Sequence, residues 1–234
     1  MTLSLFKVLP AIVIVVAVLP AEKIEGTIVI KHKLTKRSVT AEPLIYQRGP
    51  SVELGVDSES DPLAFERARV VIYLEGELPS KPVTATLEQT GRRFVPDTLV
   101  IPVGSTISFP NSDVIFHNVF SLSKSKTFDL GNYPKGGTRA VTFGRPGLVF
   151  VNCHLHPNMS AAIVVCPNSW STKADASGRF VLRDVPPGKY KVVAWHKAAG
   201  FFRQSVEVFD KRNARVDFLI PLEEHGVSGM QARR

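Results

Sequence analysis

Short apolar runs recur along the chain and alternate with turn-forming residues. The runs are rich in Val, Ile and Phe, and Gly, Pro, Asn and Asp separate them. No long stretch repeats apolar residues at helical spacing, so the sequence predicts little helix. The pattern is typical of an all-β protein built from antiparallel sandwiches. The expected strands lie within residues 26–34, 68–76, 98–111, 139–153, 161–166, 178–185, 188–196, 203–210 and 215–221.

Two changes of composition suggest the domain organisation. Residues 51–66 are acidic and weakly patterned, which indicates a long loop, and residues 167–178 are polar and rich in turn formers, which indicates a join to a last domain. We therefore expect four parts after the N-terminal 21 residues. They are a β segment over 22–82 associated with the central sandwich, that central sandwich over 83–166, a small sandwich over 167–221 and a tail over 222–234.

The N-terminus differs from the rest of the chain. Lys7 is followed by an apolar run, residues 8–19, which is too short to span a bilayer. The pattern is typical of a secretory signal peptide over 1–21, with Ala21 as its last residue. Leu19 is larger than the residue usual at that site, so an uncleaved anchor is the alternative, and it is the only membrane contact we expect. Export predicts a periplasmic or extracellular location, where disulfides persist.

The charge of the chain says little about its partners. The net charge is +8, from 29 Lys and Arg against 21 Asp and Glu. The basic residues are scattered among the expected strands and form no long run, so no nucleic-acid partner is expected. An overall positive charge favours an acidic protein partner.

The segment FVNCHLHPNMSA, residues 150–161, gathers side chains that bind metals. Cys153 and Met159 offer sulfur and His156 offers an imidazole, a combination that suits copper, whereas zinc more often draws four Cys and His ligands. A strand that ends at Cys153, followed by a tight turn, would bring His156 to the same ion and let Met159 approach axially. Such a site needs one more His from elsewhere, and His117 in FPNSDVIFHNVFS supplies it.

Two segments, GLVFVNCHLHPNMSAAIVV and FPNSDVIFHNV, resemble the cupredoxins, and among them plastocyanin and especially amicyanin. The resemblance covers roughly residues 83–166 and implies a Greek-key cupredoxin β-sandwich. It also implies one mononuclear type 1 copper, with His117, Cys153 and His156 in a trigonal plane and Met159 as the long axial ligand.

Of the two residues that flank His117, one matches this family and the other does not. Asn118 matches the family's His-Asn pair, which implies that it braces the two ligand loops and that its amide hydrogen-bonds the Cys sulfur. Phe116 stands where plastocyanins and amicyanin carry Pro, a change that leaves the ligand set intact.

Other interpretations of the same residues lead to other expectations. A Cys153–Cys166 disulfide is the main alternative in an exported protein, although Cys166 lies in an apolar run and is expected to be a core residue. His154 follows Cys153, and alternation along a strand turns it to the opposite face, so we expect it not to bind the metal. Multicopper oxidases flank this Cys with His on both sides; residue 152 is Asn, so no trinuclear cluster is expected.

The remaining His and Trp residues carry no metal spacing. We expect ordinary roles for His32, His196 and His225, and core or interface positions for Trp170 and Trp195.

The segment STKADASGRFVLRDVPPGKYKVVAWH, residues 171–196, resembles the carboxypeptidase-regulatory-like family of small Ig-like sandwiches. Asp175 and Gly178 mark one turn, and the Pro-Pro-Gly of residues 186–188 marks the next. The resemblance implies a small C-terminal Ig-like β-sandwich without catalytic groups, in a docking or spacer role.

These observations predict an exported blue-copper protein that carries single electrons between redox partner proteins and is not an enzyme. Two alternatives remain at this stage. One is a periplasmic protein that binds or delivers copper, and the other is a structural, adhesion-like β module whose metal site is not functional.

Overall fold

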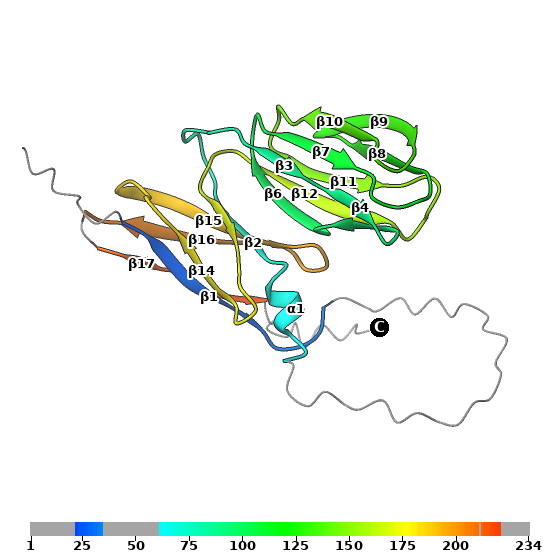
Figure 1. The fold of residues 1–234 in the computed structure, drawn as a ribbon. Coiled ribbons are helices and arrows are strands. Elements are labelled where there is room, and N and C mark those ends of the chain that lie inside the picture. Colours follow the sequence, from blue (N-terminus) through cyan, green and yellow to red (C-terminus); the bar gives the residue numbers. More distant parts are fainter. Residues whose placement is uncertain (1–21, 35–60, 211, 221–234) are drawn as a thin grey trace, which may run out of the picture.

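The computed structural model describes residues 22–34, 61–210 and 212–220, and nearly all of its regular structure is β (Figure 1). The all-β prediction is therefore confirmed. The one helix among these residues is the short α1 (Ala64–Arg67). The expected signal peptide, the tail, His225 and most of the acidic loop lie outside the described residues.

None of the helices in the described ranges has both the length and the apolar composition that crossing a bilayer requires.

A first sandwich is formed by the strands between residues 84 and 166. One sheet has the order β10-β7-β3 and the other the order β6-β12-β11-β8-β9, and β4 pairs with β5 beside them. Apolar side chains from both sheets, such as Phe109 and Ile163, fill the space between them. The strands are β3 (Thr84–Thr86), β4 (Glu88–Thr90), β5 (Arg93–Val95), β6 (Thr98–Pro102), β7 (Thr106–Pro110), β8 (His117–Ser123), β9 (Lys126–Tyr133), β10 (Thr138–Thr142), β11 (Gly147–Asn152) and β12 (Ser160–Cys166).

A second sandwich combines strands from both ends of the described chain. One sheet joins β14, β1, β17 and β18, and the other has the order β13-β2-β15-β16. Ile28, Leu74 and Val192 are among the side chains of its core. The strands are β1 (Ile24–Ile30), β2 (Val71–Leu74), β13 (Ser171–Lys173), β14 (Arg179–Leu182), β15 (Gly188–His196), β16 (Gly200–Val208), β17 (Ala214–Arg215) and β18 (Phe218–Ile220).

The strands of the N-terminal β segment pair within the second sandwich. Residues 22–82 were expected to be associated with the central sandwich; β1 pairs with β14, β17 and β18, and β2 pairs with β13 and β15, while Val71 of β2 also packs against β12. The physical reason is the burial of their apolar side chains. Alternate residues of β1, including Ile24 and Ile28, face the core of the second sandwich, and so does Ile72 of β2.

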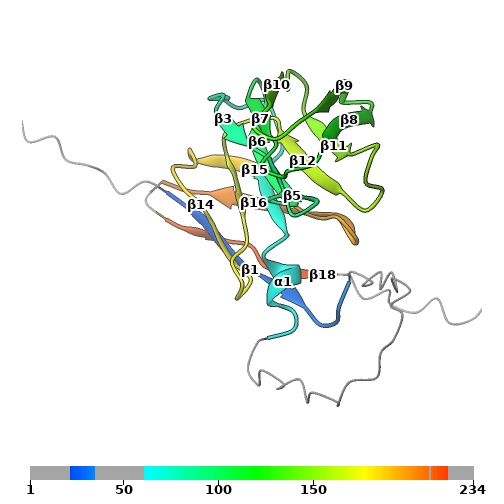
Figure 2. The ribbon, with the colours of Figure 1, turned by 45° about the vertical axis from the view of Figure 1, so that its right-hand side comes forward.

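The two sandwiches meet at β12, which is buried on both faces. Ala161, Ile163 and Val165 face the core of the first sandwich. Ala162, Val164 and Cys166 face the other way and pack with Trp195 of β15 and Val71 of β2. Figure 2 shows β12 and β15 side by side at this junction. The expected roles of Cys166 and Trp195 as core or interface residues agree with this packing.

Gly26 in β1 is a point where the second sandwich tolerates no side chain. A Cβ atom at this position would lie 1.7 Å from the backbone oxygen of Val216. We predict that Gly26→Ala lowers the free energy of unfolding by about 1–3 kcal/mol, because the overpacked backbone must shift. Denaturant unfolding followed by fluorescence or circular dichroism measures the change.

The matched control is Gly144→Ala, since a Cβ at Gly144 meets nothing within 4 Å. It should change the free energy of unfolding by less than about 0.5 kcal/mol. Equal effects of the two substitutions would contradict the close approach of β1 to Val216.

Candidate metal centre

Three side chains from two distant segments converge at one end of the first sandwich. The Nδ1 atoms of His117 and His156 lie 3.1 Å apart. The Sγ atom of Cys153 lies 3.7 Å from Nδ1 of His156 and 4.0 Å from Nδ1 of His117. Among the described residues, these three form the group of His, Cys and acidic side chains that is close enough to share one ion.

These separations fit a single metal ion. Metal–nitrogen bonds of about 2.0 Å and metal–sulfur bonds of about 2.3 Å, as in zinc proteins, place neighbouring ligand atoms roughly 3–4 Å apart. One thiolate and two imidazoles, with a thioether nearby, are a donor set that favours copper over zinc. The residues present therefore fit the copper that the sequence predicted.

His117 is oriented by a carboxylate on the loop before β8. Its Nε2 lies 2.8 Å from Oδ2 of Asp113, and its side chain is fully buried. An ionised carboxylate can only accept a hydrogen bond, so the imidazole proton resides on Nε2. Nδ1 is then left with a lone pair directed at Cys153 and His156, which is the form a metal ligand requires.

Asp113 is itself fixed by the backbone. It accepts hydrogen bonds from the N–H groups of Gly91 (2.7 Å) and Arg92 (2.9 Å), in the turn between β4 and β5. Burial raises the pKa of Asp113, but the Arg92 and Gly91 N–H groups and His117 outweigh it, so the pKa lies below its ordinary value. The carboxylate remains ionised at neutral pH, and its hold on His117 is stable there.

Asn118 connects the two segments that carry the ligands. Its backbone N–H donates a hydrogen bond to Cys153 Sγ at 3.4 Å. Its side-chain Oδ1 accepts from the His154 N–H at 3.5 Å, and its Nδ2 donates to Asp129 Oδ1 at 2.7 Å. The residue thus lies where a brace between the β8 and β11 ends must lie, and its N–H holds the Cys153 sulfur in position.

The ligand loop is closed by the ends of β11 and β12. The Cys153 N–H donates to the Met159 carbonyl at 3.2 Å, and the Met159 N–H donates to the His156 carbonyl at 2.9 Å. Met159 is buried, and its side chain packs in the same core cluster as Cys153. Backbone hydrogen bonds therefore determine the loop's shape, which limits how far its side chains can move.

His156 is the ligand candidate nearest the surface. Its side chain is half-buried, whereas His117 and Cys153 are buried. Burial lowers the pKa of His156, repulsion from His117 whenever that ring is protonated lowers it further, and so does the positive charge of Arg92. The imidazole is therefore neutral at pH 7 and can donate a lone pair to a metal.

His154 and Cys166, which were not expected to bind the metal, lie apart from the three converging side chains. The His154 ring is exposed and stacks on Phe120, with centroids 3.6 Å apart, and its Nε2 lies 3.5 Å from Asp129 Oδ2. Cys153 and Cys166 are both free. They lie at opposite ends of the β11–β12 hairpin, so roughly 20 Å of strand separates them. The sequence alone could not show this separation.

Sequence reasoning missed the two carboxylates that orient this site. For Asp113, the spacing of four residues from His117 was the available signal. Asp129 lies on β9, eleven residues from Asn118, and carried no signal because a hairpin must form before the two side chains meet.

Comparison of the structure with solved structures finds copper proteins over part of the chain. A copper-containing nitrite reductase from Thermus scotoductus is 30% identical over 38% of this chain and 23% of its own, with a TM-score of 0.33. A purple cupredoxin from Nitrosopumilus maritimus is 24% identical over 35% of this chain and 98% of its own (TM-score 0.32). Amicyanin from Paracoccus versutus is 22% identical over 40% of this chain and 96% of its own (TM-score 0.33).

No protein-family model matches the chain. No curated protein matches it in sequence. The chain spans less than a quarter of the nitrite reductase's length, so that enzyme's whole architecture is not represented here.

The contact between Asp113 and His117 leads to a prediction for metal affinity. Asp113→Ala removes the acceptor that fixes the imidazole proton on Nε2, so the affinity for copper should fall about 10- to 100-fold. Competition with a calibrated chelator measures this change. Glu207→Ala, which removes a carboxylate from the second sandwich, should leave the affinity unchanged, and an equal loss in both variants would contradict the positioning role.

The placement of His154 leads to a second prediction. His154→Ala should leave the copper affinity and the visible and EPR spectra unchanged, because its ring stacks on Phe120 away from the three ligand atoms. His156→Ala is the comparison that should change both spectra. A spectral change in the His154 variant as large as in the His156 variant would place His154 among the ligands.

Proposed function

We propose that this protein binds one copper ion at His117, Cys153 and His156, with Met159 as a weak fourth ligand, and carries single electrons. The observation that supports this most directly is the convergence of one sulfur and two imidazole nitrogens within 4.0 Å of each other. Copper supplies the chemistry of a site that gains and loses one electron.

The chain's own contribution is to keep the ligand atoms in place. Asp113 holds the His117 ring, the Asn118 N–H holds the Cys153 sulfur, and backbone hydrogen bonds hold the loop that carries His156. Because these partners are backbone groups or, for Asp113, a side chain fixed by backbone N–H groups, the ligands need little movement when an electron arrives. This rigidity supports electron transfer over catalysis of a bond change, and the proposal includes no catalysed reaction.

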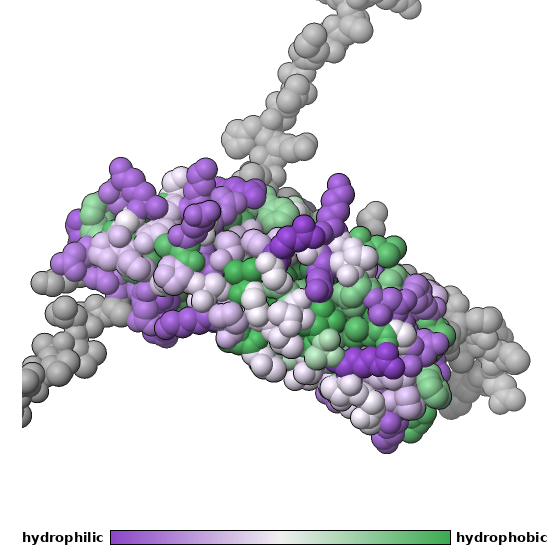
Figure 3. Space-filling view, turned by 90° about the horizontal axis from the view of Figure 1, so that it is seen from above, coloured by the Kyte–Doolittle hydropathy of each residue, from purple (hydrophilic) through white to green (hydrophobic). Residues whose placement is uncertain are grey.

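The surface around His156 supports brief contact with a partner protein. Val114, Phe116 and Leu155 are exposed apolar side chains on the loops beside the two His ligands, with exposures of 83%, 55% and 45%. On the face that Figure 3 shows, hydrophobic and hydrophilic side chains are mixed. We therefore place the docking surface at the ligand loops, where the edge of His156 offers the shortest route for an electron.

The partner and the location follow from this role. Arg92 lies close enough to His156 to lower its pKa, so a redox protein with an apolar face and an acidic rim would suit this surface. A periplasmic or extracellular location is part of the proposal. The second sandwich is proposed as a carboxypeptidase-regulatory-like, Ig-type module in a docking or spacer role.

Copper delivery is the alternative that the same ligands allow. A delivery protein must release its ion to an acceptor, which is easier when the ligands are exposed. Here His117 and Cys153 are 0% and 4% exposed. This burial supports retention of the ion through both oxidation states.

The two cysteines provide the test of the proposal. Cys153→Ser should abolish the visible band of the Cu(II) protein, because a hydroxyl cannot replace the thiolate as the charge-transfer partner. Cys166→Ser should keep the band, with a loss of stability of about 1–3 kcal/mol for a hydroxyl among the apolar side chains between the sandwiches. Visible and EPR spectra of both variants, together with unfolding curves, measure these effects.

A band that survives Cys153→Ser would rule out the thiolate ligand. Matched destabilisation by both substitutions, with no free thiol in the unfolded metal-free protein, would support the disulfide instead.

A further inference from the structure

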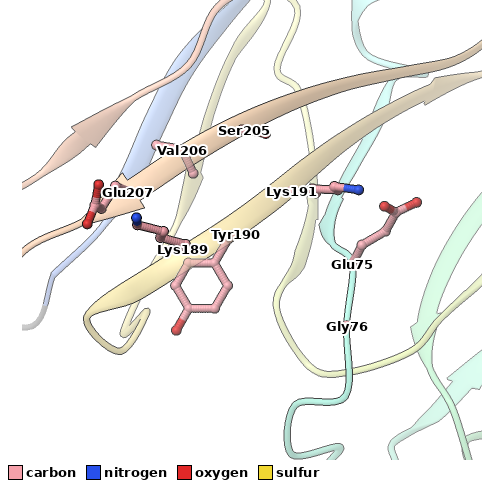
Figure 4. A pocket seen from close by; sticks show the side chains of 8 residues that line it. All are labelled: Glu75, Gly76, Lys189, Tyr190, Lys191, Ser205, Val206 and Glu207. Atoms are coloured by element: carbon pink, nitrogen blue, oxygen red, sulfur yellow. The ribbon is translucent and has the colours of Figure 1, made fainter.

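A large hollow on the second sandwich carries no proposal. It is an open groove of about 910 Å³, lined by Lys189, Lys191, Glu75 and Glu207 (Figure 4). Lys189 faces Glu207 across the β15–β16 pair, and the Lys191 and Glu75 side chains point toward one another. Each cation there has a neighbouring carboxylate, so the groove selects no particular charge.

A smaller cavity, at the junction of the two sandwiches, is lined mainly by polar and basic side chains. Its volume is about 420 Å³, within the range of small-molecule sites. Five separate segments line it: Leu34 after β1, the stretch after α1, the start of β6, the start of β12 and the β15–β16 turn. The polar lining residues are Arg69, Asp97, Thr98, Ser160, His196 and Lys197.

Two lysine side chains near this cavity donate long hydrogen bonds to uncharged oxygens. The ammonium group of Lys197 donates to Ser160 Oγ at 3.5 Å, and that of Lys173 donates to the Thr98 carbonyl at 3.4 Å, both neutral oxygens. Burial lowers the pKa of each of these two lysines, and the positive charge of Arg69 lowers each further. Three cations are therefore crowded together and partly desolvated, a situation that a bound anion relieves.

The carboxylates nearby do not cancel this charge. Asp97 pairs with Arg69, and Glu66 lies 3.1 Å from His196. Arg69, Lys173 and Lys197 thus exceed the two carboxylates by one positive charge. The Asp97 side chain is 39% exposed, so it can turn to water and leave the Arg69 guanidinium to another anion.

His196 adds a buried donor to the same lining. Its Nδ1 accepts a hydrogen bond from the Ala198 N–H at 3.2 Å, so the proton of the neutral ring is on Nε2. Nε2 is buried and lies 3.1 Å from Oε2 of the buried Glu66 carboxylate. That contact occupies the imidazole N–H, so the donors open to a ligand in this cavity are those of Arg69 and Lys197.

We propose that this cavity is a binding site for a tetrahedral oxyanion, which Arg69 and Lys197 hold. The guanidinium fork of Arg69 matches two oxygens of a phosphate, and the ammonium group of Lys197 supplies further N–H donors. The oxyanion can be free phosphate or the phosphate group of a small organic molecule, for which the cavity has room. This inference is independent of the copper proposal.

Isothermal titration calorimetry on the full chain tests this site with two probes, inorganic phosphate and glycerol 2-phosphate. Either probe should bind with saturation at one per chain. Tighter binding of glycerol 2-phosphate would identify an organic phosphate as the ligand class, and tighter binding of inorganic phosphate would identify the free ion.

Three variants separate a specific site from general attraction. Lys197→Met keeps most of the side-chain volume and should weaken binding tenfold or more, whereas Lys191→Met, in the open groove, should leave it unchanged. Asp97→Asn removes the carboxylate that competes for Arg69, so binding should tighten several-fold, a result that misfolding cannot produce. Thermal unfolding of each variant checks that the fold is retained.

Absence of saturable binding of both probes to the wild-type chain would overturn the proposal. Equal weakening by Lys197→Met and Lys191→Met, or no gain from Asp97→Asn, would also overturn it, because the anion would then respond only to overall charge.

Discussion

Strand β12 is buried on both faces, and the rest of the structure is arranged around it. One face closes the core of the first sandwich, and the other packs on Val71 and Trp195 of the second. The strand begins at Ser160, directly after Met159, so the loop that carries His156 and Met159 is anchored to a strand packed on both faces. Because apolar packing on both sides resists displacement, it also limits the movement of the loop.

Hydrogen bonds, in addition to packing, limit the movement of the side chains at the candidate metal centre. His117 begins β8, and its neighbour Asn118 ties that strand to Cys153 at the end of β11. Asp113 ties the same imidazole to the β4–β5 turn. Two sequence segments more than thirty residues apart are thereby set for one ion before the ion arrives, which lowers the reorganisation that binding requires.

The sequence predicted the features that depend on local patterns. Runs such as Ala161–Cys166 identified strands by their Val and Ile content, and the spacing of Cys153 and His156 pointed to two of the side chains that converge with His117. Strand β9 gave a weak signal, because it lies at a sheet edge and most of its side chains are exposed or half-buried.

Features that depend on distant pairing could not be predicted. The partners of β1 lie about 150 residues further along the chain, where Ile24 faces Leu182, and nothing in either segment specifies the other. The unbroken apolar run of β12 did contain a usable signal, since a strand with both faces covered loses its polar alternation. Asp113 can be read from the sequence, but its contact with His117 depends on the folded path of the loop.

A titration of the metal-free protein with Cu(II), followed by visible absorption and EPR, tests the central claim most directly. The account predicts that a thiolate-to-copper band saturates at one equivalent, bleaches on addition of one electron and returns on reoxidation with the ion still bound. No such band, or loss of the copper on reduction, would contradict an electron carrier at His117, Cys153 and His156.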